Sequence, residues 1–243
     1  MKEGRTLENS RMHEERKPHA DGVPVAQSVL DRQREHWDRT FSSQPELFGT
    51  TPSVSAQATA DLFASEGKLD LLELGAGQGR DTLFFAREGM RVHALDYSDA
   101  SVAEIRGKAA EAGLADRITA GRHDVRESLP LADASFDGCY AHMLFCMALT
   151  TTELERLAAE VRRVLRPSGL LAYTVRTTAD AHFGAGIARG DDIYETGGFI
   201  VHFFDRPLVD RLAKGYELLD VVQFEEGDLP RRLFRVTQRK ANG

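Results

Sequence analysis

The residues best suited to chemistry in this chain are an acid, Glu73, and three closely spaced glycines, Gly75, Gly77 and Gly79. Glycines at this spacing let a backbone turn approach a ligand, because they carry no side chain and adopt backbone angles that other residues avoid. A carboxylate just before the turn would repel a pyrophosphate and attract an ammonium or sulfonium group. The pattern therefore indicates a site for a nucleotide-like ligand that carries positive charge.

The spacing of the glycines differs from that of a dinucleotide-binding turn. The dinucleotide pattern G-x-G-x-x-G would need a glycine at position 80, where this chain has Arg80, and its third glycine comes one residue early. Taken alone, the turn leaves two other interpretations open, a glycine-rich turn without a ligand and a variant NAD site.

Two further acids follow at informative positions. Asp96 lies 21 residues after Gly75 (96 − 75) and ends the apolar run 91–95, where a carboxylate can accept hydrogen bonds from both hydroxyls of a ribose. NAD sites and S-adenosylmethionine (SAM) sites share this feature, and Tyr97 beside it can lie against an adenine. Asp124 follows the short run 117–121; alone it would be interpreted as an exposed loop carboxylate, but it comes in register with the two earlier signals.

These side chains require strands that end at one edge of a sheet, with helices between them. Apolar runs predict strands at 69–74, 91–95 and 117–121, a fourth within 136–148 and a fifth at 170–175, after a break at 166–169. Helical spacing and capping residues predict helices at 25–40, 53–64, 80–87, 100–112, 152–165 and 205–214. The predicted N-caps are Ser53 or Ser55, Ser98, Asp205, and Thr151 or Thr152 in a capping box with Glu155. A hairpin is expected from 218–224 and 233–238.

Taken in order, these motifs resemble class I SAM-dependent methyltransferases. The resemblance rests on the E-x-G-x-G-x-G turn at 73–79, on Asp96, on Asp124, on the LRPSGLLAYTV run at 165–175 and on the terminal hairpin, and it covers about 54–240. It implies an α/β, Rossmann-like sandwich whose mostly parallel seven-stranded sheet has an antiparallel last strand. The GQGRDTLFFAREG run at 77–89 is similar to the branch that contains tellurite-resistance and thiol or thiopurine methyltransferases.

The resemblance also implies the residues that would hold the cofactor, SAM. Asp96 would bind the ribose, Asp124 the adenine amino group, and Val125 would lie beside the ring. Trp37 would belong to a lid over the cofactor, although an aromatic residue of this size also fits a core position. The complete expected set is Trp37, Glu73, Gly75, Ala76, Gly77, Gly79, Asp81, Asp96, Tyr97, Ser98, Asp124, Val125 and Ala141.

The implied reaction is transfer of a methyl group to a small molecule, either a thiol or chalcogen compound or a small hydroxylated metabolite. A thiolate needs little base catalysis, whereas an oxygen nucleophile needs a base, for which the candidates are His202, His142 and Tyr194. Histidine at 142 could equally be a hydrogen-bonded rim or core residue. The alternatives are a non-enzymatic SAM-binding protein and an NAD-dependent oxidoreductase, the latter disfavoured by Arg80 and Glu73.

Two segments are expected on the substrate side. Residues 177–205 are rich in glycine and lack periodicity, which predicts a long loop. It could be a substrate cover that supplies a base, an ordered cap, or a metal site formed by Asp191, Asp192, His182 and His202, but no ligand spacing is diagnostic and no metal is predicted. The hairpin tip either lines the entrance to the site or forms a solvated turn, and its charged residues are Glu225, Glu226, Arg231 and Arg232.

Composition limits the remaining possibilities. The chain has 243 residues, 42% hydrophobic and 28% charged, with a formal net charge of −7, which is unsuited to a broad nucleic-acid-binding face. No apolar run approaches the ~20 residues of a membrane span, the first residues lack the apolar core of a signal peptide, and the two cysteines, Cys139 and Cys146, suggest no disulfide framework.

We therefore expect a cytoplasmic monomer or homodimer acting on a small molecule, without nucleic-acid or membrane partners. A polar tail at 1–22 is expected to be disordered, and 23–243 to form one methyltransferase domain, with 23–66 as a helical lid and 177–205 as a substrate-side insertion.

Overall fold

The computed structural model describes residues 27–227 and 231–242, apart from the side chains at 27 and 31. The tail at 1–22, for which disorder is predicted, lies outside the described residues. None of the described helices is both long and apolar enough to cross a membrane.

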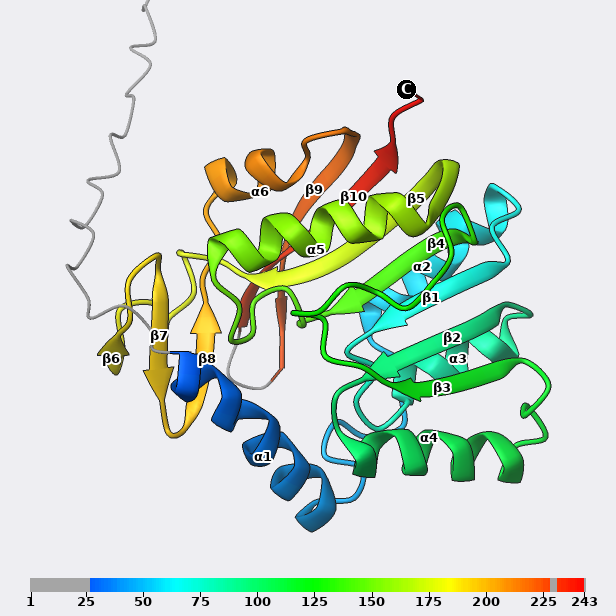
Figure 1. The fold of residues 1–243 in the computed structure, drawn as a ribbon, viewed down its shortest axis with the longest axis horizontal. Coiled ribbons are helices and arrows are strands. Elements are labelled where there is room, and N and C mark those ends of the chain that lie inside the picture. Colours follow the sequence, from blue (N-terminus) through cyan, green and yellow to red (C-terminus); the bar gives the residue numbers. More distant parts are fainter. Residues whose placement is uncertain (1–26, 228–230, 243) are drawn as a thin grey trace, which may run out of the picture.

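A seven-stranded sheet forms the centre of the fold, in the order β3-β2-β1-β4-β5-β10-β9 (Figure 1). The strands β1 to β5 pair in parallel, and β10 runs antiparallel to both β5 and β9. This confirms the predicted sheet, including its antiparallel last strand. The strand bounds are β1 Asp70–Leu74, β2 Arg91–Asp96, β3 Ile118–Arg122, β4 Phe136–His142, β5 Leu165–Arg176, β9 Tyr216–Glu226 and β10 Arg231–Lys240.

Helices cover both faces of the sheet, and each face has its own apolar cluster. One cluster joins the sheet to α5 (Thr151–Val164) and α6 (Arg206–Leu212). The other joins it to α2 (Val54–Ser65), α3 (Arg80–Arg87) and α4 (Asp99–Glu111). Burial on both faces explains why the central strands are nearly continuous runs of apolar residues. Both cysteines lie buried and free within this core.

Most helix starts follow the predicted caps. Ser53, Ser98 and Asp205 each accept a hydrogen bond from a backbone N–H in the first turn of α2, α4 and α6. The predicted capping box of α5 was placed too late, because the side chains that form it are Thr150 and Glu153.

The helix stop expected at 166–169 is confirmed, since α5 ends at Val164, but β5 begins at Leu165 and not at the predicted residue 170. Leu165 pairs with Phe136 of β4, and Arg166 forms ion pairs with Asp70 at 2.9 Å and Asp137 at 2.7 Å. The next pair in the β4–β5 ladder joins Gly138 to Leu170, so 166–169 form an irregularity in β5, and Ser168 there has a positive φ of 58°.

Residues 177–205 also differ from the predicted loop, because they contain a three-stranded antiparallel sheet of β6 (Ile187–Ala188), β7 (Ile193–Thr196) and β8 (Phe199–His202). Thr196 pairs with Phe199 across a two-residue turn in which Gly197 and Gly198 both have positive φ. Glycine pairs favour such hairpin turns, so the sequence contained a signal for the turn between β7 and β8.

The first helix, α1 (Gln27–Ser43), packs between α4 and β8. The Gln33 amide donates to the backbone oxygen of Gly198 at 2.8 Å and accepts from the N–H of Ile200 at 3.3 Å. The ring of Trp37 contacts Phe199 edge-on, with 5.3 Å between ring centroids. Figure 1 shows α1 and the small sheet beside the edge toward which β1 to β4 point.

Candidate functional site

A cavity of about 550 Å³ lies at the carboxyl edge of the sheet. Its walls come from the residues that follow β1, β2 and β3, from the ends of β4 and β5, and from α1, β8 and the β9–β10 hairpin. Ligands bind at this edge in open α/β sheets, so the cavity occupies the place that the motifs predicted.

The glycine turn combines two roles. Gly75, Gly77 and Gly79 all have positive φ, of 68°, 53° and 80°. The first two line the cavity, whereas Gly79 does not. A Cβ on Gly79 would lie 2.8 Å from Cγ1 of Ile105, so this glycine permits α3 to pack closely on α4. Ala76, between the first two, also lines the cavity.

Asp96 has the geometry expected of a diol-binding acid. Its Oδ2 accepts the N–H of Gly77 at 2.8 Å, and its Oδ1 accepts the N–H of Ser98 at 2.9 Å. An ionised carboxylate offers about four acceptor positions, so roughly two remain for a ligand. The side chain lines the cavity, and burial raises its pKa to about 6. It fits the two hydroxyls of a ribose.

The residues expected around an adenine also reach the cavity. Tyr97, Asp124 and Val125 line the same cavity, and Trp37 lies across from them on α1. Asp124 forms an ion pair with Arg126 at 2.6 Å; burial opposes its ionisation, but hydrogen bonds from Arg126 hold its pKa below the usual value. Of the expected cofactor residues, Gly79, Ser98 and Ala141 do not line the cavity, and the last two are fully buried.

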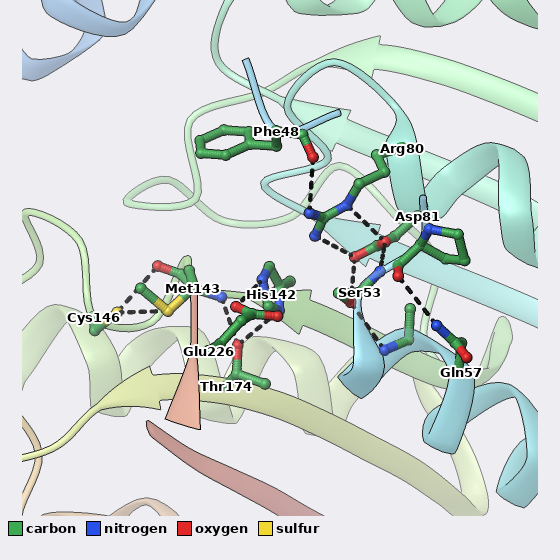
Figure 2. A network of polar contacts seen from close by, with 12 residues as sticks. Phe48, Ser53, Gln57, Arg80, Asp81, His142, Met143, Cys146, Thr174 and Glu226 are labelled. Carbon is green, nitrogen blue, oxygen red and sulfur yellow. Dashed lines mark hydrogen bonds and ion pairs between the residues drawn. The ribbon is translucent and has the colours of Figure 1, made fainter. Parts of the chain in front are cut away.

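Asp81 lines the cavity but is largely committed to the protein itself. Its two oxygens accept the N–H and the hydroxyl of Ser53, each at 2.8 Å, and it forms an ion pair with Arg80 at 3.0 Å (Figure 2). Burial opposes ionisation, but Arg80 holds the pKa of Asp81 below its usual value. The carboxylate therefore joins α2 to α3 beside the site.

Glu73, the acid expected to attract a cation, is buried at the wall of the cavity. It accepts the Thr82 hydroxyl at 2.6 Å, and burial, followed by the nearby charge of Asp81, raises its pKa to about 8. At neutral pH the side chain is mostly protonated in this structure. An arriving cation would favour its ionised form and so draw out a proton.

This raised pKa makes a prediction about stability. Between the unfolded value of 4.5 and about 8, the folded protein keeps a proton that the unfolded chain has released, so stability should fall as pH rises through this window. Glu73→Gln cannot ionise and should lose this slope, which makes it more stable than the parent at pH 8 by on the order of a few kcal/mol. Urea unfolding of both proteins at pH 5 and pH 8 measures the difference; a gap of equal size at both pH values would contradict the assignment.

The three candidate bases are placed very differently. His142 lines the cavity, with Nδ1 3.0 Å from the hydroxyl of Thr174 and Nε2 3.4 Å from the carboxylate of Glu226 (Figure 2). The backbone N–H of Met143 donates to the same hydroxyl at 2.9 Å. When Nε2 of His142 carries a proton, the hydrogen bond that it donates to Glu226 is the largest cause that lowers the pKa of this carboxyl.

Neither of the other candidates lines the cavity. His202 is buried and its Nδ1 donates to the backbone oxygen of Leu149 at 2.8 Å, while burial lowers its pKa. Tyr194 packs edge-on against Phe183 and Phe203. The cavity thus contains one of the three expected bases, His142.

The four charged residues at the hairpin tip form two pairs, one facing the cavity and one facing away from it. Glu226 pairs in register with Arg231, and both line the cavity. Glu225 pairs with Arg232, and these two face away and bind each other at 3.2 Å. Strand alternation explains the division. The sequence named all four residues, and only the strand register could separate them.

The sequence interpretation named only some of the residues that line the cavity, and Arg176 and His123 are among those that it left out. Arg176 ends β5, and His123 precedes Asp124; both line the cavity. Neither residue belongs to a motif. The one available signal for Arg176 was its position at the end of the fifth predicted strand, which points toward the site. Across the described ranges, no group of three or more His, Cys, Asp or Glu side chains is arranged to hold a metal ion, so the four residues considered for a metal are not brought together.

Comparison with known proteins gives consistent matches. Residues 71–169 match a family model described as a methyltransferase domain. The malonyl-[acyl-carrier protein] O-methyltransferase of Pectobacterium atrosepticum is 30% identical over 160 residues, which are 65% of this chain and 58% of that protein. A human thiol S-methyltransferase is 34% identical over 119 residues, 46% of this chain and 44% of that protein. The chain thus spans about half the length of these curated relatives.

The fold comparison extends over nearly the whole chain. The Burkholderia thailandensis 1,6-didemethyltoxoflavin-N1-methyltransferase, solved with 1,6-didemethyltoxoflavin and S-adenosylhomocysteine, superposes with a TM-score of 0.72 at 20% identity. The match covers 92% of this chain and 94% of that structure. At this identity the likeness establishes the fold.

Proposed function

We propose that this chain is a class I SAM-dependent methyltransferase, which binds SAM and transfers its methyl group to a small molecule. One observation carries the proposal. A single cavity joins the diol-binding acid Asp96 to a wall that holds His142 and Glu226. A donor nucleoside and an acceptor can therefore lie in contact within one cavity.

The described residues suit the parts of SAM. Asp96 would hold the ribose, Asp124 and Val125 the adenine, and the turn at 75–77 the methionine portion beside Glu73. We further propose that 23–66 and 177–205 cover the donor and the acceptor. Gln33 and Trp37 support this, because they join α1 to the small sheet over the cavity.

When bound, SAM supplies a methyl group already activated by its sulfonium. The protein then contributes alignment and the exclusion of water, and alignment alone is worth roughly 7–11 kcal/mol in model reactions. These contributions need no fixed nucleophile in the protein.

The acceptor expected from the sequence is a thiol or chalcogen compound, or a small hydroxylated metabolite. The surroundings of His142 favour the hydroxylated class, for which a base is useful. In the tautomer with its proton on Nδ1, His142 donates to Thr174 and leaves Nε2 to take the acceptor's proton. The imidazolium formed then faces the ionised Glu226 at 3.4 Å.

Titration calorimetry with S-adenosylhomocysteine, SAM and NAD tests the donor, and a screen with methyl-labelled SAM against thiols, phenols and alcohols tests the transfer. We expect S-adenosylhomocysteine to bind in the micromolar range and NAD to bind far more weakly. Preferential NAD binding would overturn the donor assignment, and tight SAM binding without turnover across the panel would favour a non-enzymatic SAM-binding protein.

A further inference from the structure

The acceptor side of the cavity carries two arginines that the proposed methyl transfer does not use. Arg176 comes from the end of β5 and Arg231 from the start of β10, the neighbouring strand. Their guanidinium groups are planar donors that match carboxylate and phosphate oxygens. What each already binds decides whether it is available to a ligand.

Hydrogen bonds fix one edge of the Arg176 guanidinium group and leave one terminal nitrogen for other partners. Its Nε and Nη2 donate to the two oxygens of Asp180, whose side chain is fully buried. Asp180 is itself fixed by the backbone N–H groups of His182 and Arg232, each at 2.9 Å. The guanidinium lies 5.2 Å from the centre of the Phe203 ring. Its Nη1 has no hydrogen-bond partner among the described residues.

Arg231 is positioned by strand register rather than by an acid. It lies opposite Glu226 in the β9–β10 ladder, so both side chains are on the cavity side of the hairpin. The carboxylate of Glu226 lies 3.4 Å from Nε2 of His142, and the two form an ion pair when the imidazole is protonated. Within the described part of the chain, no carboxylate oxygen lies within 4.0 Å of the Arg231 guanidinium.

Some arginine N–H donors at this end of the cavity therefore have no acceptor within the described residues. Asp81 is paired with Arg80, the nearest basic group to Glu226 is His142 at 3.4 Å, and Asp180 lies outside the cavity lining, bonded to Arg176. The Nη1 group of Arg176 and the guanidinium of Arg231 remain for a ligand. Phe199, Val201 and Phe203 add apolar surface beside them.

From this arrangement we propose that the methyl acceptor carries an anionic oxygen group, a carboxylate or a phosphate, which binds Arg231 and Nη1 of Arg176. The apolar body of the acceptor would lie against Phe203. The inference rests on the proposed function, because it takes this end of the cavity to be the acceptor site. It narrows the expected hydroxylated metabolites to hydroxy acids and phosphorylated alcohols.

The test uses three small probes of similar size: benzoate, phenyl phosphate and neutral benzamide. Binding to the full chain, alone and saturated with S-adenosylhomocysteine, is followed by calorimetry and by the fluorescence of Trp37, the single tryptophan. We expect at least one anionic probe to bind and Arg231→Gln to weaken it about tenfold, the effect of losing one charge-assisted hydrogen bond. The preference between benzoate and phenyl phosphate tells the carboxylate from the phosphate.

Arg232→Gln is the matched control, because it removes the same charge from the next residue on the outer face of the hairpin. Arg176→Lys keeps the charge, loses the planar fork, and should also weaken the anionic probes. Equal binding by the Arg231→Gln and Arg232→Gln proteins, or binding of benzamide as tight as that of the anions, would overturn the inference. Failure of S-adenosylhomocysteine to bind the unaltered chain would instead overturn the proposed function, while the probe measurements on the free protein would still stand.

Discussion

Replacing Asp96 with alanine should weaken the binding of S-adenosylhomocysteine at least about 100-fold. In the proposed complex both ribose hydroxyls donate to this carboxylate, and a hydrogen bond to a charged group is worth about 1.5–3 kcal/mol. Losing two of them corresponds to roughly two or more factors of ten in the dissociation constant. The substitution also removes the acceptors for the N–H groups of Gly77 and Ser98, which help to shape the turn.

Calorimetry on Asp96→Ala and on Asp99→Ala separates these effects. Asp99 is an exposed acid three residues later that does not line the cavity, so its replacement should leave affinity within about twofold. Thermal unfolding of both variants shows whether the loss comes from the fold. Affinity of Asp96→Ala close to that of the parent would refute the ribose assignment.

The pH dependence gives the same assignment a second check. Burial raises the pKa of Asp96 to about 6 in the free protein, so below this pH the carboxyl gains a proton and loses acceptor capacity. Affinity for S-adenosylhomocysteine should therefore begin to fall as the pH drops through about 6. Asp96→Asn should bind more weakly at pH 7 and lack this dependence.

Replacing His142 with glutamine should lower kcat by roughly 100-fold or more for a hydroxylated acceptor, which is the lower range for losing a general base. The affinity for S-adenosylhomocysteine should change little, because the proposed donor contacts lie on other strands. Glutamine retains a polar group of similar length beside Thr174 and Glu226, so the wall of the cavity should keep its shape.

Glu226→Gln provides a related measurement, because Glu226 acts through His142. Loss of its charge removes the carboxylate that faces the imidazolium formed in the reaction, so kcat should fall while the affinity for S-adenosylhomocysteine changes little. The other charged or titratable groups near His142 are Arg80, Asp81, Tyr140 and Arg231, and they are unchanged in this variant. His93→Gln, which alters a histidine outside the cavity lining, serves as the control. A kcat for His142→Gln near that of the parent would show that alignment alone suffices.

The sequence predicted the donor side of the site far better than the acceptor side, for a physical reason. Asp96 and Asp124 follow strands of a parallel sheet, whose ends must meet at one edge, so local patterns were enough to bring them together. His202 was a candidate because it follows a glycine-rich segment, but register in β7–β8 turns it into the core. Side-chain direction in short strands depends on pairing partners, which local patterns do not specify.

The contacts of His142 also could not be predicted from local sequence patterns. Thr174 belongs to β5 and Glu226 to the last hairpin, 32 and 84 residues away (174 − 142 and 226 − 142). No motif links residues at such separations. Burial likewise decides the protonation of Glu73, whose carboxylate the sequence interpretation took to be charged.

The amide of Gln33 has a consequence for the order of events during a catalytic cycle. By bonding both Gly198 and Ile200, it ties α1, proposed to cover the donor, to the small sheet, proposed to cover the acceptor. If both segments cover the cavity as proposed, they would open together, and neither product would leave while the other is enclosed. S-adenosylhomocysteine and the methylated product would then leave during the same opening step. The rate at which the hydrogen bonds of Gln33 break would limit turnover.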